Sequence, residues 1–387
     1  MRTRLLGPIA ALVACGESST PAPPIRFLHT FAAEETELFN ATIAEKGIRV
    51  ESSIVPFARG QQVIGEMLIA GTRCPDLIRI DATWLPALRA ELEPVPAALA
   101  ELDWTPEAAA LVIDPAGAAG TFAAVPQAID GLVVVRDRAR PAPISTSIDD
   151  LVAAARSATR GPGSGYPLGL RVDGYWLVPW LRAEGVELAI SDPEPKSAGI
   201  ESERSVKALA RFAALFGDLA APPPPAGSET PDELRRWNAG ELAYWVTGPW
   251  ALGAIRDRDR LAVSSLAHAP RGGQLLVVPK CAKRPAEGWK LAAELTDVAF
   301  LAKFAETFGT VPTRKSALAI APQIARDLYA ALATTEPLRR DPRTPLLFDD
   351  LNPALAAVIA HDATPDEAIA GVRRGWQRLA AAWARKK

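Results

Sequence analysis

The chain has 387 residues and a net charge of −2, with 49% hydrophobic and 23% charged residues. This length is too great for one compact core and predicts two domains, and the composition is typical of a globular protein. Because basic and acidic residues are interspersed and nearly balanced, the chain has no charge signature for binding nucleic acid.

The first residues have the features of an export signal. Two arginines precede an apolar run over residues 5–13, which is too short to span a bilayer, and Cys15 follows Leu-Val-Ala. A cysteine in this position resembles the bacterial lipobox. We therefore predict a signal peptide over residues 1–14, a lipidated Cys15, and a tether over residues 15–24 that anchors an exported protein to the membrane without spanning it. The alternative is a buried apolar segment with an incidental cysteine.

Strand and helix patterns alternate from residue 25 onwards. Three segments alternate like strands, and two have apolar residues at helical spacing: 25–29, 48–51 and 77–80, and 36–46 and 61–70. This order predicts an α/β fold with a mainly parallel sheet and helices on both faces. In such sheets ligands bind beyond the carboxyl ends of strands, and Asp81 stands at one of those ends.

Capping sequences mark later helices. Thr230 and Thr364 each begin a capping box with proline at the first helical position, and Ser147 opens a helix in a similar way. The last helix has an apolar stripe that includes Trp376 and Trp383, which we predict to pack in the core.

Residues 237–252 contain three tryptophans. The pattern predicts the end of a helix, a turn at Gly240, a short apolar strand, and a Gly-Pro turn that places Trp250 at a loop tip. An indole in such a loop either packs into a core or offers a flat apolar surface to a ligand, and taken alone packing is the more common role. We assign Trp237 and Trp245 to the core.

Motifs for catalysis or metal binding are scarce. The three histidines are far apart and no Cys-x-x-Cys occurs, so neither a metal nor a cofactor is expected. The glycine-rich segment 161–165 lacks the Lys-Ser/Thr pair of a phosphate-binding loop. Acidic residues are abundant, which leaves a carbohydrate-acting enzyme with two catalytic carboxylates as an alternative.

Several segments, taken in order, resemble the extracellular solute-binding proteins of ABC transporters, and the maltose- and trehalose-type sugar-binding branch is the most similar. Residues 68–84 resemble a segment with a glycine turn, Pro-Asp, and a strand ending in Asp before a Trp. Residues 122–131 resemble the entry to the hinge, and residues 237–252 resemble a segment that ends in Gly-Pro-Trp. Residues 272–279 and 308–315 resemble the return strand and a later hinge segment. The resemblance covers nearly the whole mature chain.

This resemblance implies a two-lobed periplasmic-binding-protein fold of type II, similar to maltose-binding protein, with a ligand cleft between the lobes. The hinge crossovers would lie near Asp130, Arg271 and Pro312. Lobe one would comprise residues 25–129 and 272–312, and lobe two residues 130–271 and 313–387.

The resemblance also implies the residues that bind a sugar. A pyranose ring stacks its C–H face on aromatic side chains, while its hydroxyls bond to carboxylates and arginine. The candidates are Trp250, Asp81, Asp130, Trp84, Glu35 and Arg343. The last three have structural alternatives, which are packing at a helix start for Trp84, a favourable charge near a helix N-terminus for Glu35, and a solvated loop charge for Arg343.

The chain departs from this branch at positions where relatives often carry aromatic residues. These positions are Ala128, Val134, Val135 and Gln274. We therefore expect a less aromatic site and a small or differently shaped ligand.

The chain has two cysteines besides Cys15, which are Cys74 and Cys281. The residues alone leave two possibilities open, a disulfide in an oxidising compartment or two buried thiols. The resemblance places Cys74 before a strand of lobe one and Cys281 after the neighbouring return strand, which implies a disulfide between them.

We therefore predict a lipid-anchored, monomeric receptor that captures a disaccharide or short oligosaccharide for an ABC importer. Its partners would be the sugar and the membrane permease subunits, and it would perform no chemistry. The alternatives are a receptor of the same fold for another small polar solute, a carbohydrate-acting enzyme, and a sensor subunit that reports to a membrane kinase.

Overall fold

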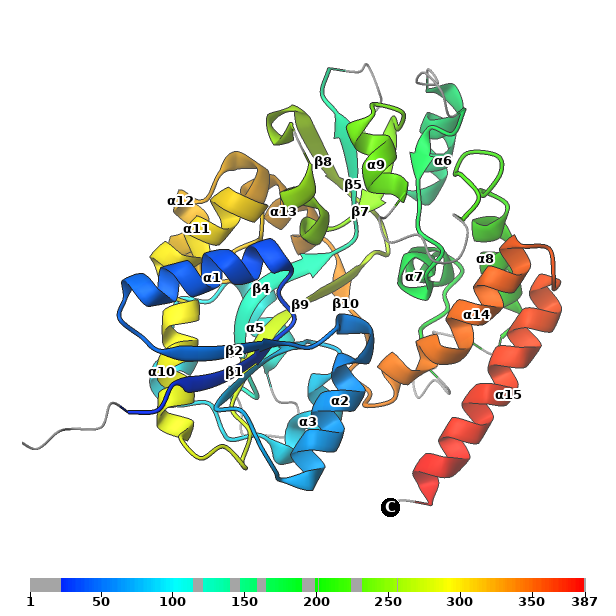
Figure 1. Cartoon of the computed structure of the whole chain (residues 1–387). Helices are drawn as coiled ribbons and strands as arrows, with labels where there is room; N and C mark the ends of the chain where they lie inside the picture. The colour runs from blue at the N-terminus through cyan, green and yellow to red at the C-terminus, as the bar shows by residue number, and fades with distance from the viewer. Residues whose placement is uncertain are drawn as a thin grey trace, which may run out of the picture.

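The chain folds into two α/β bodies, each built on its own β-sheet (Figure 1). The structure is a computed structural model that describes residues 22–113, 121–139, 147–158, 165–189, 199–200, 202–223, 232–255 and 257–385. Within these residues one sheet has six strands and the other has four. We call the body around the six-stranded sheet lobe one and the body around the four-stranded sheet lobe two.

The sheet of lobe one has the order β10-β9-β3-β1-β2, with β4 also paired to β9. β1 runs parallel to β2 and β3, as the alternation of strands and helices predicted, whereas β9 runs antiparallel to β3 and β4. The strands are β1 (Ile25–His29), β2 (Val50–Ile54), β3 (Leu77–Asp81), β4 (Val125–Gly131), β9 (Pro270–Val277) and β10 (Glu336–Pro337).

The helices of lobe one cover this sheet and bury an apolar core against it. They are α1 (Ala33–Glu45), α2 (Phe57–Ala70), α3 (Leu85–Leu88), α4 (Ala97–Ala100), α5 (Pro106–Val112), α10 (Pro285–Leu295), α11 (Val298–Phe308) and α12 (Lys315–Ile320). α2 ends where predicted, because Gly71 has the left-handed φ of 63° that closes a helix. It begins four residues before the predicted start at residue 61.

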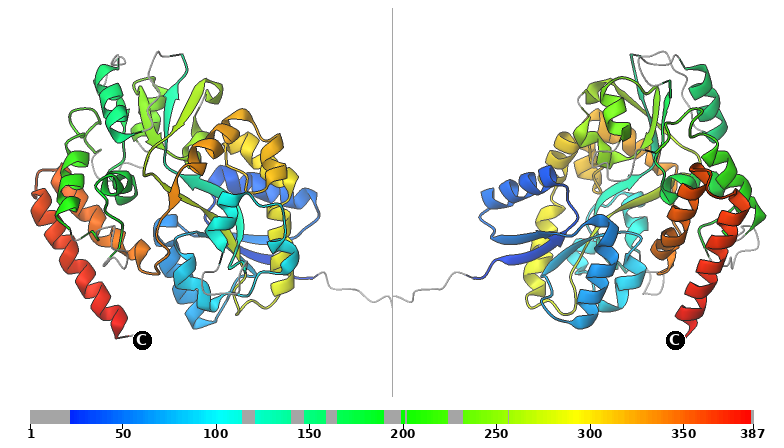
Figure 2. Two further views of the ribbon diagram at one scale, coloured as in Figure 1. Left: turned by 180° about the vertical axis from the view of Figure 1, so that it is seen from behind. Right: turned by 45° about the vertical axis from the view of Figure 1, so that its right-hand side comes forward.

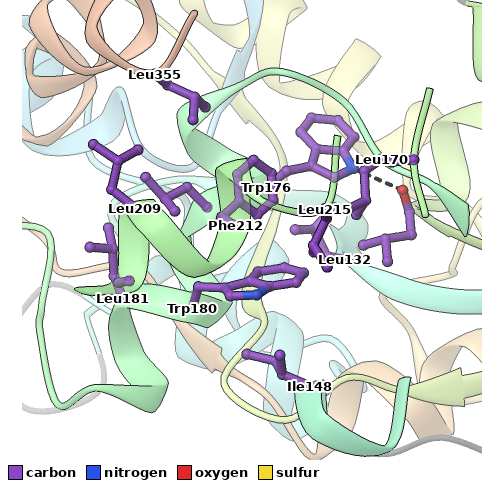
Figure 3. Packing of buried hydrophobic residues seen from close by; sticks show 14 of the residues in the cluster. Leu132, Ile148, Leu170, Trp176, Trp180, Leu181, Leu209, Phe212, Leu215 and Leu355 are labelled. Carbon is purple, nitrogen blue, oxygen red and sulfur yellow. Dashed lines mark hydrogen bonds between the residues drawn. The ribbon is translucent and has the colours of Figure 1, made fainter. Parts of the chain in front are cut away.

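Lobe two has the strand order β6-β7-β5-β8, in which β7 and β8 flank β5 in antiparallel register. Its strands are β5 (Val133–Asp137), β6 (Leu168–Gly169), β7 (Tyr244–Thr247) and β8 (Leu261–Ser265). Its helices are α6 (Ile148–Ser157), α7 (Gly174–Ala183), α8 (Glu203–Ala213), α9 (Asp232–Asn238), α13 (Gln323–Ala333), α14 (Phe348–Ile359) and α15 (Pro365–Ala384). Aromatic residues of α7 and α8 fill its core, where Trp180 and Phe212 meet edge to face (Figure 3).

The capping sequences act as predicted wherever the structure describes them. The hydroxyl of Ser147 accepts a hydrogen bond from the Asp150 amide at the start of α6, and Thr364 forms a full capping box at the start of α15. Thr230 lies outside the described residues. Trp376 is buried as predicted, but Trp383 is only partly buried, because the last turns of α15 project beyond the lobe (Figures 1 and 2).

The chain passes between the two sheets at the ends of β4 and β8. β4 belongs to lobe one and β5 to lobe two, with only Leu132 between them. Gly131 has a φ of 150°, and a β-carbon there would lie 2.6 Å from the Pro270 carbonyl oxygen, so this crossing requires glycine. The chain returns between β8 and β9, over residues 266–269.

The third passage of the chain between the lobes involves several elements and not one short segment. α12 packs against α11 of lobe one, although residues after 312 were expected in lobe two. α13 then packs against β8, and β10 pairs with the start of β9. α14 and α15 finally lie side by side along the outer side of lobe two (Figure 2).

Cys74 and Cys281 form a disulfide with their α-carbons 5.8 Å apart. The bond joins the segment before β3 to the segment after β9, two antiparallel neighbours in the sheet. This is the pairing that the resemblance implied. The expected signal peptide and Cys15 lie outside the described residues.

Candidate ligand-binding site

The candidate site begins where three strands of lobe one meet the crossing to lobe two. Asp81 is the last residue of β3, and the antiparallel register places it opposite Gln274 of β9. On the other side of β9, Asp130 near the end of β4 lies opposite Gly272. The two carboxylates therefore flank one strand at the carboxyl edge of the parallel sheet, the edge at which ligands bind in such folds.

One amide joins the two carboxylates. The side-chain nitrogen of Gln274 donates hydrogen bonds of 3.2 Å to an oxygen of Asp81 and 3.2 Å to an oxygen of Asp130. The other oxygen of Asp81 accepts from the amide and the hydroxyl of Thr83, at 2.8 and 2.5 Å. We call Asp81, Asp130 and Gln274 the hinge cluster.

A buried arginine extends the hinge cluster into lobe one. The guanidinium of Arg79 donates to the Thr30 hydroxyl at 2.7 Å and to the Gln127 side-chain oxygen at 3.1 Å. Thr30 donates in turn to the side-chain oxygen of Gln274 at 3.3 Å. The guanidinium also lies over the Phe31 ring, 4.4 Å from its centroid. These contacts orient the Gln274 amide so that its nitrogen faces both carboxylates.

Burial makes ionisation of these carboxylates costly. Burial, followed by the nearby Asp81 carboxylate, raises the pKa of Asp130 to about 7. Burial also raises the pKa of Asp81, against hydrogen bonds from Thr83 and Gln274 that lower it. The two neighbouring carboxylates therefore share a proton near neutral pH.

Trp250 brings an aromatic surface from lobe two to the crossing. It lies in a 3-10 helix (Pro249–Ala254) that directly follows β7, whereas a loop was predicted. Its indole is 48% exposed and meets the rings of Trp176 and Tyr175 edge to face, at centroid distances of 5.9 and 6.5 Å. A β-carbon on Gly248 would lie 2.3 Å from this indole and 2.5 Å from the Gly131 carbonyl oxygen, so Gly248 packs against both the indole and the crossing.

Tyr175 completes the contact between the lobes. It stands at the start of α7, where the Asp173 side chain accepts from its amide at 2.8 Å. Its hydroxyl donates to the Pro270 carbonyl oxygen at 3.3 Å. Burial and the negative charges of Asp130 and Asp81 raise the pKa of Tyr175, so its hydroxyl stays protonated.

Three predicted site residues have structural roles here. Trp84 is buried in the lobe-one core with its indole against Gly60, so it presents no open stacking surface. The Glu35 carboxylate accepts from the Ala32 amide at 2.8 Å and so caps α1, although its charge also acts on the buried Arg79. The guanidinium of Arg343 is held by the carboxylate of Asp341 at 2.8 and 2.5 Å.

Sequence reasoning missed Arg79, Thr30, Gln127 and Tyr175, and it treated Gln274 only as a departure from relatives. One signal was present for Arg79. It lies two residues before Asp81 in an otherwise apolar strand, so both charged side chains must share one face of the sheet. The exposed Phe57, whose ring lies 5.1 Å from that of Trp84, is a further aromatic side chain after the end of β2.

Two kinds of feature are absent from the described part of the chain. No group of three or more His, Cys, Asp or Glu side chains there is arranged to hold a metal ion. Among the same residues, none of the helices has the length and hydropathy needed to cross a membrane.

Solved structures show that this architecture is shared. The GacH receptor of Streptomyces glaucescens, solved in unliganded and acarbose-bound forms, superposes with a TM-score of 0.77 at 22% identity, covering 92% of this chain and 98% of that one. Maltose-bound MalE3 of T. maritima gives 0.77 at 18% identity, covering 92% and 99%. The maltotriose-bound maltotriose-binding protein of Thermus thermophilus gives 0.73 at 19% identity, covering 91% and 99%. These likenesses establish the two-lobed fold that the sequence resemblance implied.

Sequence comparison identifies the family. No curated protein sequence matches the chain significantly. The family model described as bacterial extracellular solute-binding protein matches residues 37–331, which is most of the chain. Members of this family are extracellular proteins that bind solutes. The chain therefore belongs to the bacterial extracellular solute-binding protein family.

Proposed function

We propose that this protein captures a sugar, a disaccharide or short oligosaccharide, at the junction of its two lobes and delivers it to an ABC importer without altering it. The observation that carries the proposal is the place of Tyr175, whose ring meets the Trp250 indole and whose hydroxyl lies, like the Asp130 carboxylate, against Gly272. Carboxylates and an amide offer acceptors and donors to sugar hydroxyls, and the exposed indole offers a surface to the C–H face of the ring. Several proteins of the same fold are described as bound to maltose or maltotriose.

The position of the site supports a capture mechanism. Asp81 and Gln274 belong to lobe one, Trp250 and Tyr175 belong to lobe two, and Asp130 lies one residue before the crossing glycine. A ligand that contacts both sets favours the arrangement in which the lobes are closed around it. The same contacts exclude water from the charged groups, which strengthens their hydrogen bonds to the ligand.

The direct test is a binding screen of the purified mature protein. Mono-, di- and trisaccharides, polyols and polyamines are added during thermal unfolding, because a ligand specific to the folded state raises the melting temperature. We expect a rise with one or more sugars, confirmed by calorimetry, and recovery of the sugar unchanged. A rise with polyols or polyamines alone would favour a receptor for another polar solute, and release of monosaccharides would favour an enzyme.

We also propose that Cys15 carries the lipid that holds the protein at the membrane, where it meets the permease subunits as a monomer. Two structural neighbours are described as ABC transporter solute-binding or substrate-binding proteins. Replacing Cys15 with serine should move the protein from the membrane fraction to the soluble exported fraction. Retention of the C15S variant in the membrane fraction would contradict this anchor.

A further inference from the structure

The outer side of α15 carries charge of one sign. Residues 368–387 include six basic residues and no acidic residue, whereas the whole chain has 43 basic and 45 acidic residues. Three of the six, Arg374, Arg378 and Arg385, have exposed side chains. At about 3.6 residues per turn their directions from the helix axis differ by no more than about 40°, so they form one row along the helix. We call these three arginines the basic stripe.

The basic stripe lies opposite the side of α15 that packs on lobe two. Val372 and Trp376 are buried in the core of the lobe, and α14 and α8 contact the helix. Trp383 follows Trp376 by two turns on the same side, but it is only partly buried because the last turns project beyond the lobe (Figures 1 and 2). Basic residues on one side and a tryptophan on the other are typical of helices that lie on a bilayer surface.

The charge of the basic stripe is not neutralised by neighbouring acids. In the part of the chain that the structure describes, none of its guanidinium groups forms an ion pair with a carboxylate. The Asp350 carboxylate of α14 is directed at the buried Gly375, where a β-carbon would lie 2.0 Å from its oxygen. The helix macrodipole favours basic residues within the last turn, which accounts for Arg385 but not for Arg374 and Arg378. The stripe is therefore available to an anionic partner.

The proposed lipid on Cys15 would keep this stripe close to a membrane. The guanidinium of Arg284 donates to the carbonyl oxygens of Pro23, at 2.6 Å, and Pro24, and so holds the end of the tether on lobe one. The seven residues 16–22 between this point and Cys15 span at most roughly 25 Å. β1, which follows the tether, and the last turns of α15 both lie in the lower half of the molecule in Figures 1 and 2. Both can therefore face the same bilayer.

We propose that the basic stripe docks on the anionic surface of the membrane in which the lipid anchor is inserted. Its guanidinium groups would donate hydrogen bonds to lipid phosphates, and Trp383 would lie at the level of the headgroups. Two contacts, the anchor at lobe one and the stripe at lobe two, would hold the protein in one orientation with α15 against the bilayer. The inference rests on the proposed membrane anchor and goes beyond the proposed capture of a sugar.

Vesicle sedimentation tests the contact in the absence of the anchor. The mature protein with Cys15→Ser, which carries no lipid, is mixed with vesicles of phosphatidylcholine alone or of equal parts phosphatidylcholine and phosphatidylglycerol. A stripe variant of this protein has glutamine in place of the three arginines. The matched control has glutamine in place of three exposed basic residues outside α15, which are Arg138, Lys315 and Arg326. Melting curves establish that all three proteins are folded.

We expect the parent protein to sediment with the anionic vesicles but not with the neutral ones, and to bind less as the salt concentration rises. The stripe variant should bind the anionic vesicles roughly one hundredfold more weakly, because each basic side chain near an anionic surface contributes about fivefold. The control, which loses the same net charge, should bind like the parent.

Two results would overturn the inference while leaving the proposed capture of a sugar intact. One is that the parent protein does not bind anionic vesicles, and the other is that the stripe variant binds them as tightly as the parent. If the stripe variant keeps its vesicle binding but loses transport in cells, the stripe serves an acidic protein partner instead of the bilayer.

A high-salt wash of cell membranes separates this inference from the proposed anchor. High salt weakens an electrostatic contact but does not extract an inserted lipid. The wash should therefore release the Cys15→Ser protein, and the stripe substitutions should release it without the wash. Cys15→Ser protein that stays with the membranes after the wash would contradict the lipid anchor, whereas the vesicle result alone decides the role of the stripe.

Discussion

Replacement of Trp250 by alanine is expected to weaken sugar binding about tenfold. The indole is 48% exposed, which for a side chain of roughly 250 Å² leaves about 120 Å² of surface for a ligand. A ring stacked on one face covers roughly half of that area, and about 60 Å² at ~25 cal/mol per Å² corresponds to about 1.5 kcal/mol. This value is the expected loss of binding free energy.

Calorimetry with the best sugar from the screen measures this loss. The buried half of the indole packs against Trp176 and Tyr175, so the alanine variant should also melt at a lower temperature. Trp250→Phe is the matched control, because a smaller ring keeps part of both the packing and the stacking surface. It should lose less affinity than the alanine variant. A Kd for the alanine variant within twofold of the unmodified value, with the protein folded, would refute the stacking role of Trp250.

Three other predictions follow from single features of the structure. Burial raises the pKa of Asp130 to about 7, and a sugar hydroxyl donates a stronger hydrogen bond to the ionised carboxylate than to the neutral acid. Affinity should therefore fall from pH 8 to pH 6, by up to about tenfold, and Asp130→Asn should abolish this dependence. A flat Kd across that range in the unmodified protein would contradict the assignment. Cys281→Ser should lower the free energy of unfolding by about 2–4 kcal/mol, because it removes a disulfide between residues 207 positions apart in the sequence. Denaturant titration measures this change. Equal stability of the unmodified protein with and without reductant would contradict the disulfide. Gly60→Ala should destabilise lobe one by about 1–3 kcal/mol, because the added β-carbon would lie 2.3 Å from the buried Trp84 indole. The matched control Gly65→Ala should be neutral or stabilising, because its β-carbon would have only a 3.7 Å contact. Similar melting temperatures for the two variants would refute this packing.

The sequence predicted those elements whose formation depends on residues close to them in the chain. The helices that begin at Ser147 and Thr364 start where predicted, because a capping hydroxyl acts within three residues of its own position. The parallel arrangement of the first strands followed from their alternation with helices. The two-residue strands β6 and β10 were not predicted, since two residues carry no periodic pattern.

The burial of Trp84 and Trp250 was not determined by the residues next to them in the sequence. Trp84 and Trp250 each follow a strand and a short turn, and both were candidate platforms. Gly60 of α2 lets the chain approach the indole of Trp84, which is buried, whereas the indole of Trp250 is 48% exposed. Burial depends on neighbours that are distant in sequence, so the pattern around each tryptophan could not distinguish them.

The sequence by itself determined the α/β class, the family, the position of Asp81 at a strand end and that of Asp130 near a hinge crossover, because strand periodicity and motif order can be recognised along the chain. Only the tertiary structure decided that Gln274 joins these two carboxylates, from 193 and 144 residues away. Its place depends on the antiparallel register of β9 against both β3 and β4, and that register is set by pairing between distant segments. The same pairing explains why Gln274, which stands where relatives often carry an aromatic residue, lies at the centre of the candidate site.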